Sequence, residues 1–198
     1  MPISRIIYFT ILSAFLGVYL AVNMDQLVSN FNNKPILTIE REPEELVELE
    51  LFWDIFNYSQ DTNPQLDGED SLIIARAIMD NANKYNLDPG LVVSVIEHES
   101  TFNPDAVSHM GAIGLMQIMP NTGKAVATQL GINDYSLYHI EDNIQIGTHY
   151  LMYLIELYDN DYHKALTAYN RGPQGLQTFV KSTGTPKSNY SKTILNNY

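Results

Sequence analysis

Residues 87–108 read LDPGLVVSVIEHESTFNPDAVS, and this stretch decides how the middle of the chain folds. Asp88 and Pro89 are typical of a helix start, with aspartate as the N-cap and proline in the first turn. Asn103-Pro104 blocks a long continuation, because a residue before proline disfavours helical backbone. We therefore expect a helix between these two signals.

This helix places an acid on an apolar stripe. At about 100° per residue, Val92, Val95 and Ile96 share one side of the helix. Glu99 falls on the same side, one turn later. Burial and the partial negative charge of a helix C-terminus both favour a protonated carboxyl, as a general acid requires. On composition alone, an ordinary helix-end glutamate remains the plainer interpretation.

Composition and charge limit the class of protein. The 198 residues are 45% hydrophobic and 17% charged, which is typical of one globular core with an appendage. The net charge of -12 argues against nucleic acid as a partner. The absence of cysteine excludes a disulfide framework and a cysteine nucleophile. The five histidines have no metal-ligand spacing, so we predict no metal site.

The N-terminal segment is predicted to meet a membrane. Residues 6–22, IIYFTILSAFLGVYLAV, carry no charge and are at the lower limit of length for a spanning helix. No good small-x-small cleavage site follows, so an uncleaved anchor over residues 1–23 is favoured over a cleaved signal peptide. Arg5 before the run and the acids after it orient the rest of the chain outward.

Residues 24–69 are predicted to be an acidic tether that contains an amphipathic helix at residues 44–58, EELVELELFWDIFNY. Its apolar residues share a helical stripe, and the glutamates lie mostly off it. They are Leu46, Leu49, Phe52, Trp53 and Phe56. The plainer interpretation is a helix docked on the following domain; the alternative is a docking helix for another protein of an envelope complex. The turn-rich residues 60–71 are predicted to mark a domain boundary.

The rest of the chain, residues 70–198, is predicted to be a mainly helical domain. Beyond the helix described above, periodicity and turn signals predict further helices. They are expected at 71–85, 121–130, 142–158, 162–169, 173–181 and 187–196.

Two further segments carry residues suited to a binding cleft. After the acid comes GAIGLMQIMP, in which Gly111 and Gly114 permit a close-approaching backbone and Gln117 supplies an amide that donates and accepts. Later, AYNRG at residues 168–172 places a ring beside an amide. A flat ring for stacking and an amide for hydroxyl or acetamide groups suit sugar recognition.

Taken in order, these motifs resemble the soluble lytic transglycosylases (SLT) of the lysozyme-like superfamily. The resemblance covers about residues 70–198 and leaves residues 1–69 outside it. It is carried by LDPGLVVSVIEHESTFNPDAVS, GAIGLMQIMPNTG, IEDNIQIGTHYLMYLIELY, ALTAYNRGPQGL and NYSKTIL. It implies a mainly α, lysozyme-like fold of the goose-lysozyme/SLT type. It also implies cleavage of the MurNAc–GlcNAc bond of peptidoglycan, with a 1,6-anhydro end and without a cofactor.

The resemblance also assigns roles to residues by their position in the matched motifs. Glu99 matches the catalytic acid/base, and Ser108 a hydroxyl that contacts that acid or the substrate. The substrate-binding residues that the resemblance implies are Ser108, Gly114, Leu115, Met116, Gln117, Tyr169, Asn170 and Tyr190. The setting implied is the periplasm of a Gram-negative cell, with the chain anchored in the inner membrane or secreted if the N-terminal segment is cleaved. The sequence leaves open a host, secretion-system or phage role.

A count of carboxylates indicates the mechanism. Most glycoside hydrolases use two carboxylates that flank the scissile bond. Glu97 faces another side of the helix, and Asp105 lies in a turn. Glu141 and Asp142 are expected in the first turn of a helix, where acids are favoured. No second carboxylate is evident, so a single acid is predicted to act twice.

Two other functions remain open from the sequence. The first is a hydrolytic muramidase of goose-lysozyme type on the same fold, which a second carboxylate near Glu99 would favour. The second is a scaffold protein that binds peptidoglycan without cleaving it. A pure binding protein has no need for an acid on an apolar stripe.

Overall fold

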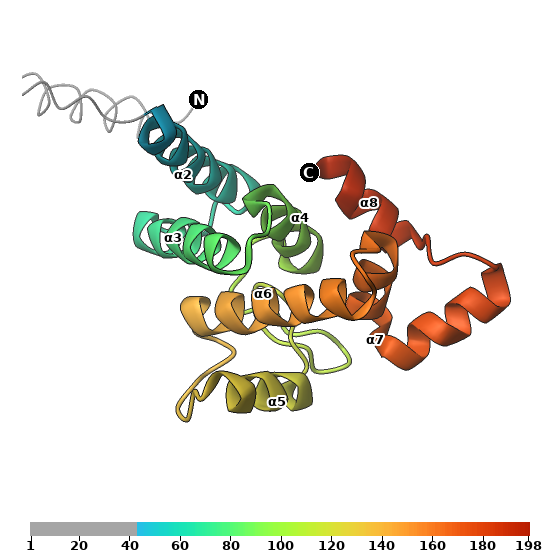
Figure 1. The fold of residues 1–198 in the computed structure, drawn as a ribbon. Coiled ribbons are helices and arrows are strands. Elements are labelled where there is room, and N and C mark those ends of the chain that lie inside the picture. The colour runs from blue at the N-terminus through green and yellow to red at the C-terminus, as the bar shows by residue number, and fades with distance from the viewer. Residues whose placement is uncertain (1–42) are drawn as a thin grey trace, which may run out of the picture. The chain divides into compact units, whose positions relative to one another are not determined.

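The structure is a computed structural model that describes residues 43–198, and this part of the chain is built of helices without a strand. The helices are α2 (Pro43–Thr62), α3 (Gly68–Tyr85), α4 (Pro89–Ser100), α5 (Pro120–Leu130), α6 (Ile140–Leu157), α7 (Tyr162–Thr183) and α8 (Asn189–Asn197) (Figure 1). The predicted mainly helical class is confirmed.

The predicted anchor and the first part of the tether lie outside the described residues. Within residues 43–198, none of the helices combines the length and apolar character needed to cross a membrane.

The helix boundaries follow the local signals in the sequence. The Asp88 side chain accepts a hydrogen bond from the Gly90 N–H and caps α4, as predicted. Thr101, in left-handed conformation, ends the same helix. The two helices predicted at 162–169 and 173–181 form the two halves of α7. Gly172, with φ of 73°, breaks the helical backbone between them and precedes Pro173.

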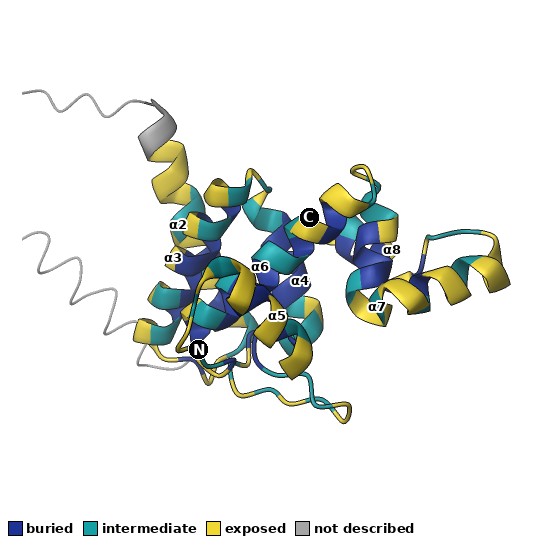
Figure 2. Ribbon diagram, turned by 60° about the horizontal axis from the view of Figure 1, so that its bottom comes forward, coloured by how far each residue is buried: buried dark blue, intermediate teal, exposed yellow. Residues whose placement is uncertain are grey.

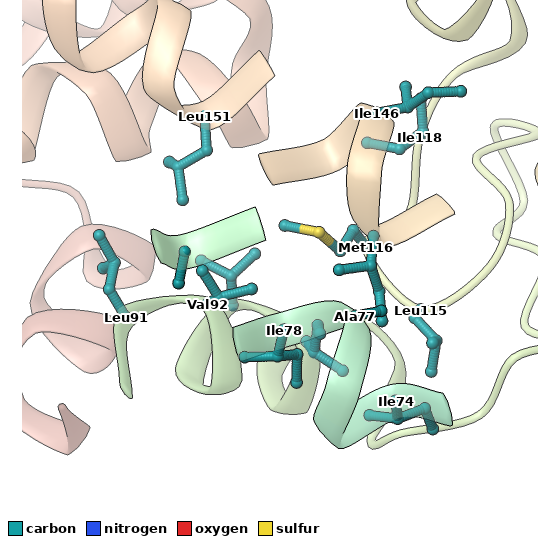
Figure 3. Packing of buried hydrophobic residues seen from close by; sticks show 14 of the residues in the cluster. Ile74, Ala77, Ile78, Leu91, Val92, Leu115, Met116, Ile118, Ile146 and Leu151 are labelled. Atoms are coloured by element: carbon teal, nitrogen blue, oxygen red, sulfur yellow. The ribbon is translucent and has the colours of Figure 1, made fainter. Parts of the chain in front are cut away.

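One hydrophobic core joins the helices. α3 and α6 pack against each other, and α4 and α7 add buried aliphatic side chains to the same cluster. Figure 3 shows Met116, from the loop between α4 and α5, among the side chains of α3, α4 and α6. Gly147 on α6 leaves the space that the Met116 side chain fills, because a Cβ at that position would overlap the methionine. The loop is therefore part of the core.

α2 packs on the helical body through a face that overlaps the predicted stripe only in part, since Phe52 and Phe56 of that stripe are partly buried against the core. Ile55 and Ser59 are buried against α3, whereas Leu46 and Trp53 are exposed. Figure 2 shows the exposed N-terminal half of α2. Two overlapping apolar periodicities run along this helix, and the contact with α3 selects the one that contains Ile55.

The compact unit begins at Pro43. The boundary predicted at residues 60–71 thus falls between two helices that pack together. The assignment of the enzymatic domain to residues 70–198 stays a prediction.

Replacing Ile55 by alanine tests the docking of α2. We expect Ile55→Ala to lower the free energy of unfolding by about 2–4 kcal/mol, because a nearly fully buried side chain leaves a cavity. Leu49→Ala, on the same helix and 40% exposed, is the matched control and is expected to change it by less than about 1 kcal/mol. Urea unfolding of both variants measures the difference. Equal losses would show that α2 does not pack on α3 in solution.

Candidate active site

The half-buried carboxyl of Glu99 lies in the last turn of α4 and meets Tyr190 of α8. The Tyr190 hydroxyl donates a hydrogen bond of 2.6 Å to Glu99 Oε1. Tyr190 is buried, and the His98 ring packs edge-on against it, with centroids 4.7 Å apart. Tyr190, which the resemblance assigns to substrate binding, therefore makes a direct polar contact with the acid.

Burial sets the protonation of this pair. Burial raises the pKa of the Glu99 carboxyl above its ordinary value, and the hydrogen bond from Tyr190 opposes that rise. Burial, followed by the charge of Glu99, raises the pKa values of the Tyr169 and Tyr190 phenols well above their usual range. Both phenols consequently remain donors at neutral pH.

The backbone that follows Glu99 is held by residues from α2 and its C-terminal end. Thr101 and Phe102 both have left-handed backbone, with φ of 53° and 58°, so the chain turns sharply after the acid. The Phe102 ring is fully buried and packs edge-on against Tyr58, with centroids 6.0 Å apart. Asn63 Nδ2 donates to the Phe102 carbonyl at 2.9 Å. These contacts fix the end of α4, where the acid lies.

The loop of residues 113–117 is tied to α6 by Asn143. The Met116 N–H donates to Asn143 Oδ1 at 2.8 Å. Asn143 Nδ2 donates to the carbonyls of Ile113, at 2.9 Å, and Leu137, at 2.8 Å. Gly114 has a φ of 78°, and a Cβ there would overlap the Asn143 amide. Sequence reasoning missed Asn143. The available signal was a polar residue among the apolar residues of the predicted helix.

Residues 114–117, which the resemblance assigns to substrate binding, lie in this loop. Leu115 and Met116 are fully buried, so these two side chains belong to the core. Gln117 Nε2 donates to the carbonyls of Ala106, at 3.0 Å, and Gly114, at 2.9 Å, and closes the loop on itself. Their predicted contact with substrate stays a prediction.

Tyr169 connects this loop to α7. Its hydroxyl donates to the Met116 carbonyl at 2.9 Å, and its ring lies 5.5 Å from that of Tyr150 on α6. Tyr150 is stacked with Tyr153, one turn later on α6, with centroids 6.4 Å apart. Asn170, the next residue, is exposed and lines a cavity together with Tyr190 and His98. The rings of Tyr169, Tyr150 and Tyr153 form a row, of which Tyr153 is the exposed member.

Ser108 takes part in a turn. Its hydroxyl accepts a hydrogen bond from the Ala112 N–H at 3.0 Å, and its own N–H donates to the Ala112 carbonyl at 2.9 Å. These bonds close residues 108–112 into a tight loop. The predicted contact of Ser108 with Glu99 or substrate stays a prediction.

The other carboxylates considered from the sequence have local roles. Glu97 interacts with the Tyr58 hydroxyl, on the side of α4 that faces α2. Asp142 accepts from the Ser136 N–H at 2.9 Å. Asp105 lies exposed in a turn that the Asn103 side chain closes by accepting from the Asp105 N–H, at 3.0 Å. Within residues 43–198, no group of three His, Asp or Glu residues is arranged to hold a metal ion.

Comparisons with known proteins assign the chain to a family. The family model described as the transglycosylase SLT domain matches residues 76–192, more than half of the chain. The chain belongs to the transglycosylase SLT family. Its SLT domain contains the loop of residues 113–117 and the residues that surround Glu99, whereas α2 precedes the match.

Curated relatives carry related names. The soluble lytic murein transglycosylase of Salmonella typhimurium is 36% identical over 99 residues, which is 48% of this chain and 15% of that protein. The membrane-bound lytic murein transglycosylase C of Actinobacillus pleuropneumoniae is 40% identical over 82 residues, which is 39% of this chain and 22% of that protein. The chain thus matches less than a quarter of the length of either relative.

A solved structure has the same fold. The crystal structure of the 70-kDa soluble lytic transglycosylase of Escherichia coli aligns with 75% of this chain and 29% of its own chain, with a TM-score of 0.56 and 24% identity. The lysozyme-like SLT fold expected from the sequence is therefore confirmed.

Removing the Asn143 amide tests its hold on the loop. We expect Asn143→Ala to lower the free energy of unfolding by at least about 2 kcal/mol, because buried N–H and carbonyl groups lose their partners. Asn81→Ala, which removes one bond to the Ala77 carbonyl on α3, is the control and is expected to change it by less than about 1 kcal/mol. Thermal unfolding followed by circular dichroism compares them. Similar losses in both variants would argue against Asn143 as the anchor of the loop.

Replacing Tyr190 by phenylalanine tests the electrostatics of the acid. The hydrogen bond from Tyr190 lowers the pKa of Glu99, so Tyr190→Phe is expected to raise that pKa further. The carboxyl ¹³C signal of Glu99, followed by NMR during a pH titration, measures the change. Tyr138→Phe, at an exposed tyrosine, is the control. A lowered or unchanged pKa in Tyr190→Phe would be inconsistent with the observed contact.

Proposed function

We propose that this protein is a peptidoglycan lytic transglycosylase that cleaves the MurNAc-(β1,4)-GlcNAc bond and leaves a 1,6-anhydroMurNAc end. The observation that carries the proposal is the half-buried carboxyl of Glu99, with a raised pKa and a phenol partner, within an SLT-family domain. Both curated relatives described above are named lytic murein transglycosylases.

The reaction uses Glu99 twice. Protonated Glu99 gives its proton to the glycosidic oxygen, and the bond from that oxygen to C1 of the muramic residue breaks. The Glu99 carboxylate then takes the proton of the C6 hydroxyl, whose oxygen closes on C1. The acid is restored and no water is consumed. Positioned proton transfer contributes about 10²–10⁴-fold to the rate, and holding the C6 hydroxyl near C1 contributes further.

The environment of Glu99 suits both steps. Burial keeps the proton on the carboxyl for the first step, since the charged form is disfavoured there. The Tyr190 hydroxyl then stabilises the carboxylate that forms and fixes its orientation for the second step. Activity that needs the protonated form falls as the pH rises through the raised pKa of Glu99.

The placement of the other carboxylates favours this reaction over hydrolysis. Most retaining and inverting hydrolases use a second carboxylate across the scissile bond. Glu97 and Asp142 are engaged with groups on other sides of the fold.

The row of Tyr169, Tyr150 and Tyr153 supplies rings on which sugar faces pack.

We also propose that the chain is held at the inner membrane by residues 6–22, with its helical unit facing the periplasm. The uncharged run and the membrane-bound relative support this placement. The exposed apolar side chains of α2, among them Leu46, Val47 and Trp53, are where a protein of an envelope complex is expected to bind.

Product analysis tests the proposed reaction. The full chain in detergent is incubated with purified sacculi, and the released fragments are identified by mass spectrometry. We expect anhydromuramyl ends and a loss of at least about 10²-fold in release for Glu99→Gln, because the proton donor is gone.

Glu97→Gln, two residues away on the same helix, is the matched control and is expected to retain activity. Fragments with reducing ends would identify a hydrolase instead. Sacculi that are bound but uncut by the wild-type chain would identify a binding protein.

A further inference from the structure

The charges of the chain are divided unevenly along its length. None of the 23 acids lies beyond Asp161, whereas five of the 11 lysines and arginines do. The chain as a whole carries -12, yet α7, α8 and their connection have only basic charged side chains. This basic C-terminal segment supplies Tyr169 and Tyr190, the two phenols whose pKa values are raised in part by the charge of Glu99.

A cavity lies within this segment, directly beside the acid's phenol partner. Its volume is about 360 Å³, and it is lined by side chains of α4, α7 and α8. Figure 1 shows α8 beside α4 and α7, in agreement with its contacts to both helices. The lining includes Asn170, Tyr190 and the two cations Arg171 and Lys187. The cavity is at the small end of ligand sites, which measure roughly 300–1,000 Å³.

The two cations are free to meet a ligand. The ion pairs of residues 43–198 involve Arg76, Lys164 and His139, and neither Arg171 nor Lys187 takes part in one. The Arg171 guanidinium is placed over the Phe179 ring, 4.9 Å from its centroid, which restricts its position. Gly175 permits the close approach of the Arg171 side chain, since a Cβ there would lie 2.8 Å from Arg171 Cβ.

We propose that this cavity binds a carboxylate of the peptide stem carried by the muramic residue next to the scissile bond. The inference rests on the proposed function, because it takes peptidoglycan as the substrate. The sugars of the glycan strand are N-acetylated and uncharged, and the muramic lactyl group is linked to peptide, so free carboxylates are supplied by the stem. A cavity with two unpaired cations beside Tyr190 fits that group and not an uncharged sugar ring.

The physical basis is a charge-assisted contact next to the reaction centre. A guanidinium held on a ring presents a fixed donor pair to a carboxylate, and a lysine adds a point charge. The contact is exposed at its rim, so it contributes modestly and is weakened by salt. It sets which strands are bound, while Glu99 and Tyr190 carry out the chemistry.

Binding tests the proposal without requiring cleavage. The full chain with Glu99→Gln, in detergent, is titrated with a disaccharide–tetrapeptide muropeptide and with the same muropeptide after its stem carboxyl groups have been converted to amides. We expect the ligand with free carboxylates to bind about five- to tenfold more tightly at low salt. The Arg171→Gln/Lys187→Gln double variant is expected to lose this difference, and Lys181→Gln, an exposed lysine of α7 outside the cavity lining, to keep it.

The outcomes separate this proposal from the proposed function. Equal weakening of both ligands in the double variant, or no weakening of either, would overturn the carboxylate site. In parallel, the chain with Glu99 intact is assayed for fragment release from sacculi. Binding that depends on the stem carboxylates, without fragment release, would leave the cavity assignment standing and refute the transglycosylase activity. Release of anhydromuramyl fragments, together with equal binding of the free and the amidated muropeptide, would do the reverse.

Discussion

The hydrogen bonds of one buried amide, that of Asn143, hold the loop on which the rest of the site depends. The amide accepts from the Met116 N–H and donates to two carbonyls, so it satisfies three backbone groups in or beside the core. With that loop fixed, the Met116 side chain enters the core and its carbonyl receives the Tyr169 hydroxyl. α6, the loop and α7 are thereby placed relative to one another by a chain of directional contacts.

The acid itself reflects a balance of two opposing effects. Burial disfavours the carboxylate of Glu99, and the Tyr190 hydroxyl favours it. A group that must first donate and later accept a proton needs neither effect to dominate completely. The bond between α4 and α8 therefore does more than join two helices; it limits how far burial shifts the acid.

Local signals in the sequence were sufficient to predict the helices, and less sufficient for the site. The ends of α4 follow from Asp88, Pro89 and Asn103-Pro104, because capping and proline sterics act within a few residues. The orientation of α2 did not follow, since two apolar periodicities overlap and only the contact with α3 selects between them.

The candidate site was predicted mainly through the resemblance. It led to Glu99 and Tyr190, which the fold brings into contact across 91 positions of sequence. Periodicity cannot separate an apolar residue of a cleft from one of the core, so the burial of Leu115 and Met116 was not foreseen. Asn143 was missed because a polar residue on a helix is usually solvated, and its pairing with the bare backbone of Gly114 is a long-range feature.

The break at Gly172 divides α7 into two parts that differ in their contacts. Before Gly172, the helix is bound into the core and carries Tyr169; after it, the chain forms an arm that returns to α8 through residues 184–188. Because the backbone at Gly172 does not transmit helical phase, the arm can change in length or sequence without rotating Tyr169. The fold can thus accept an insertion in the arm while the position of the Tyr169 hydroxyl stays fixed.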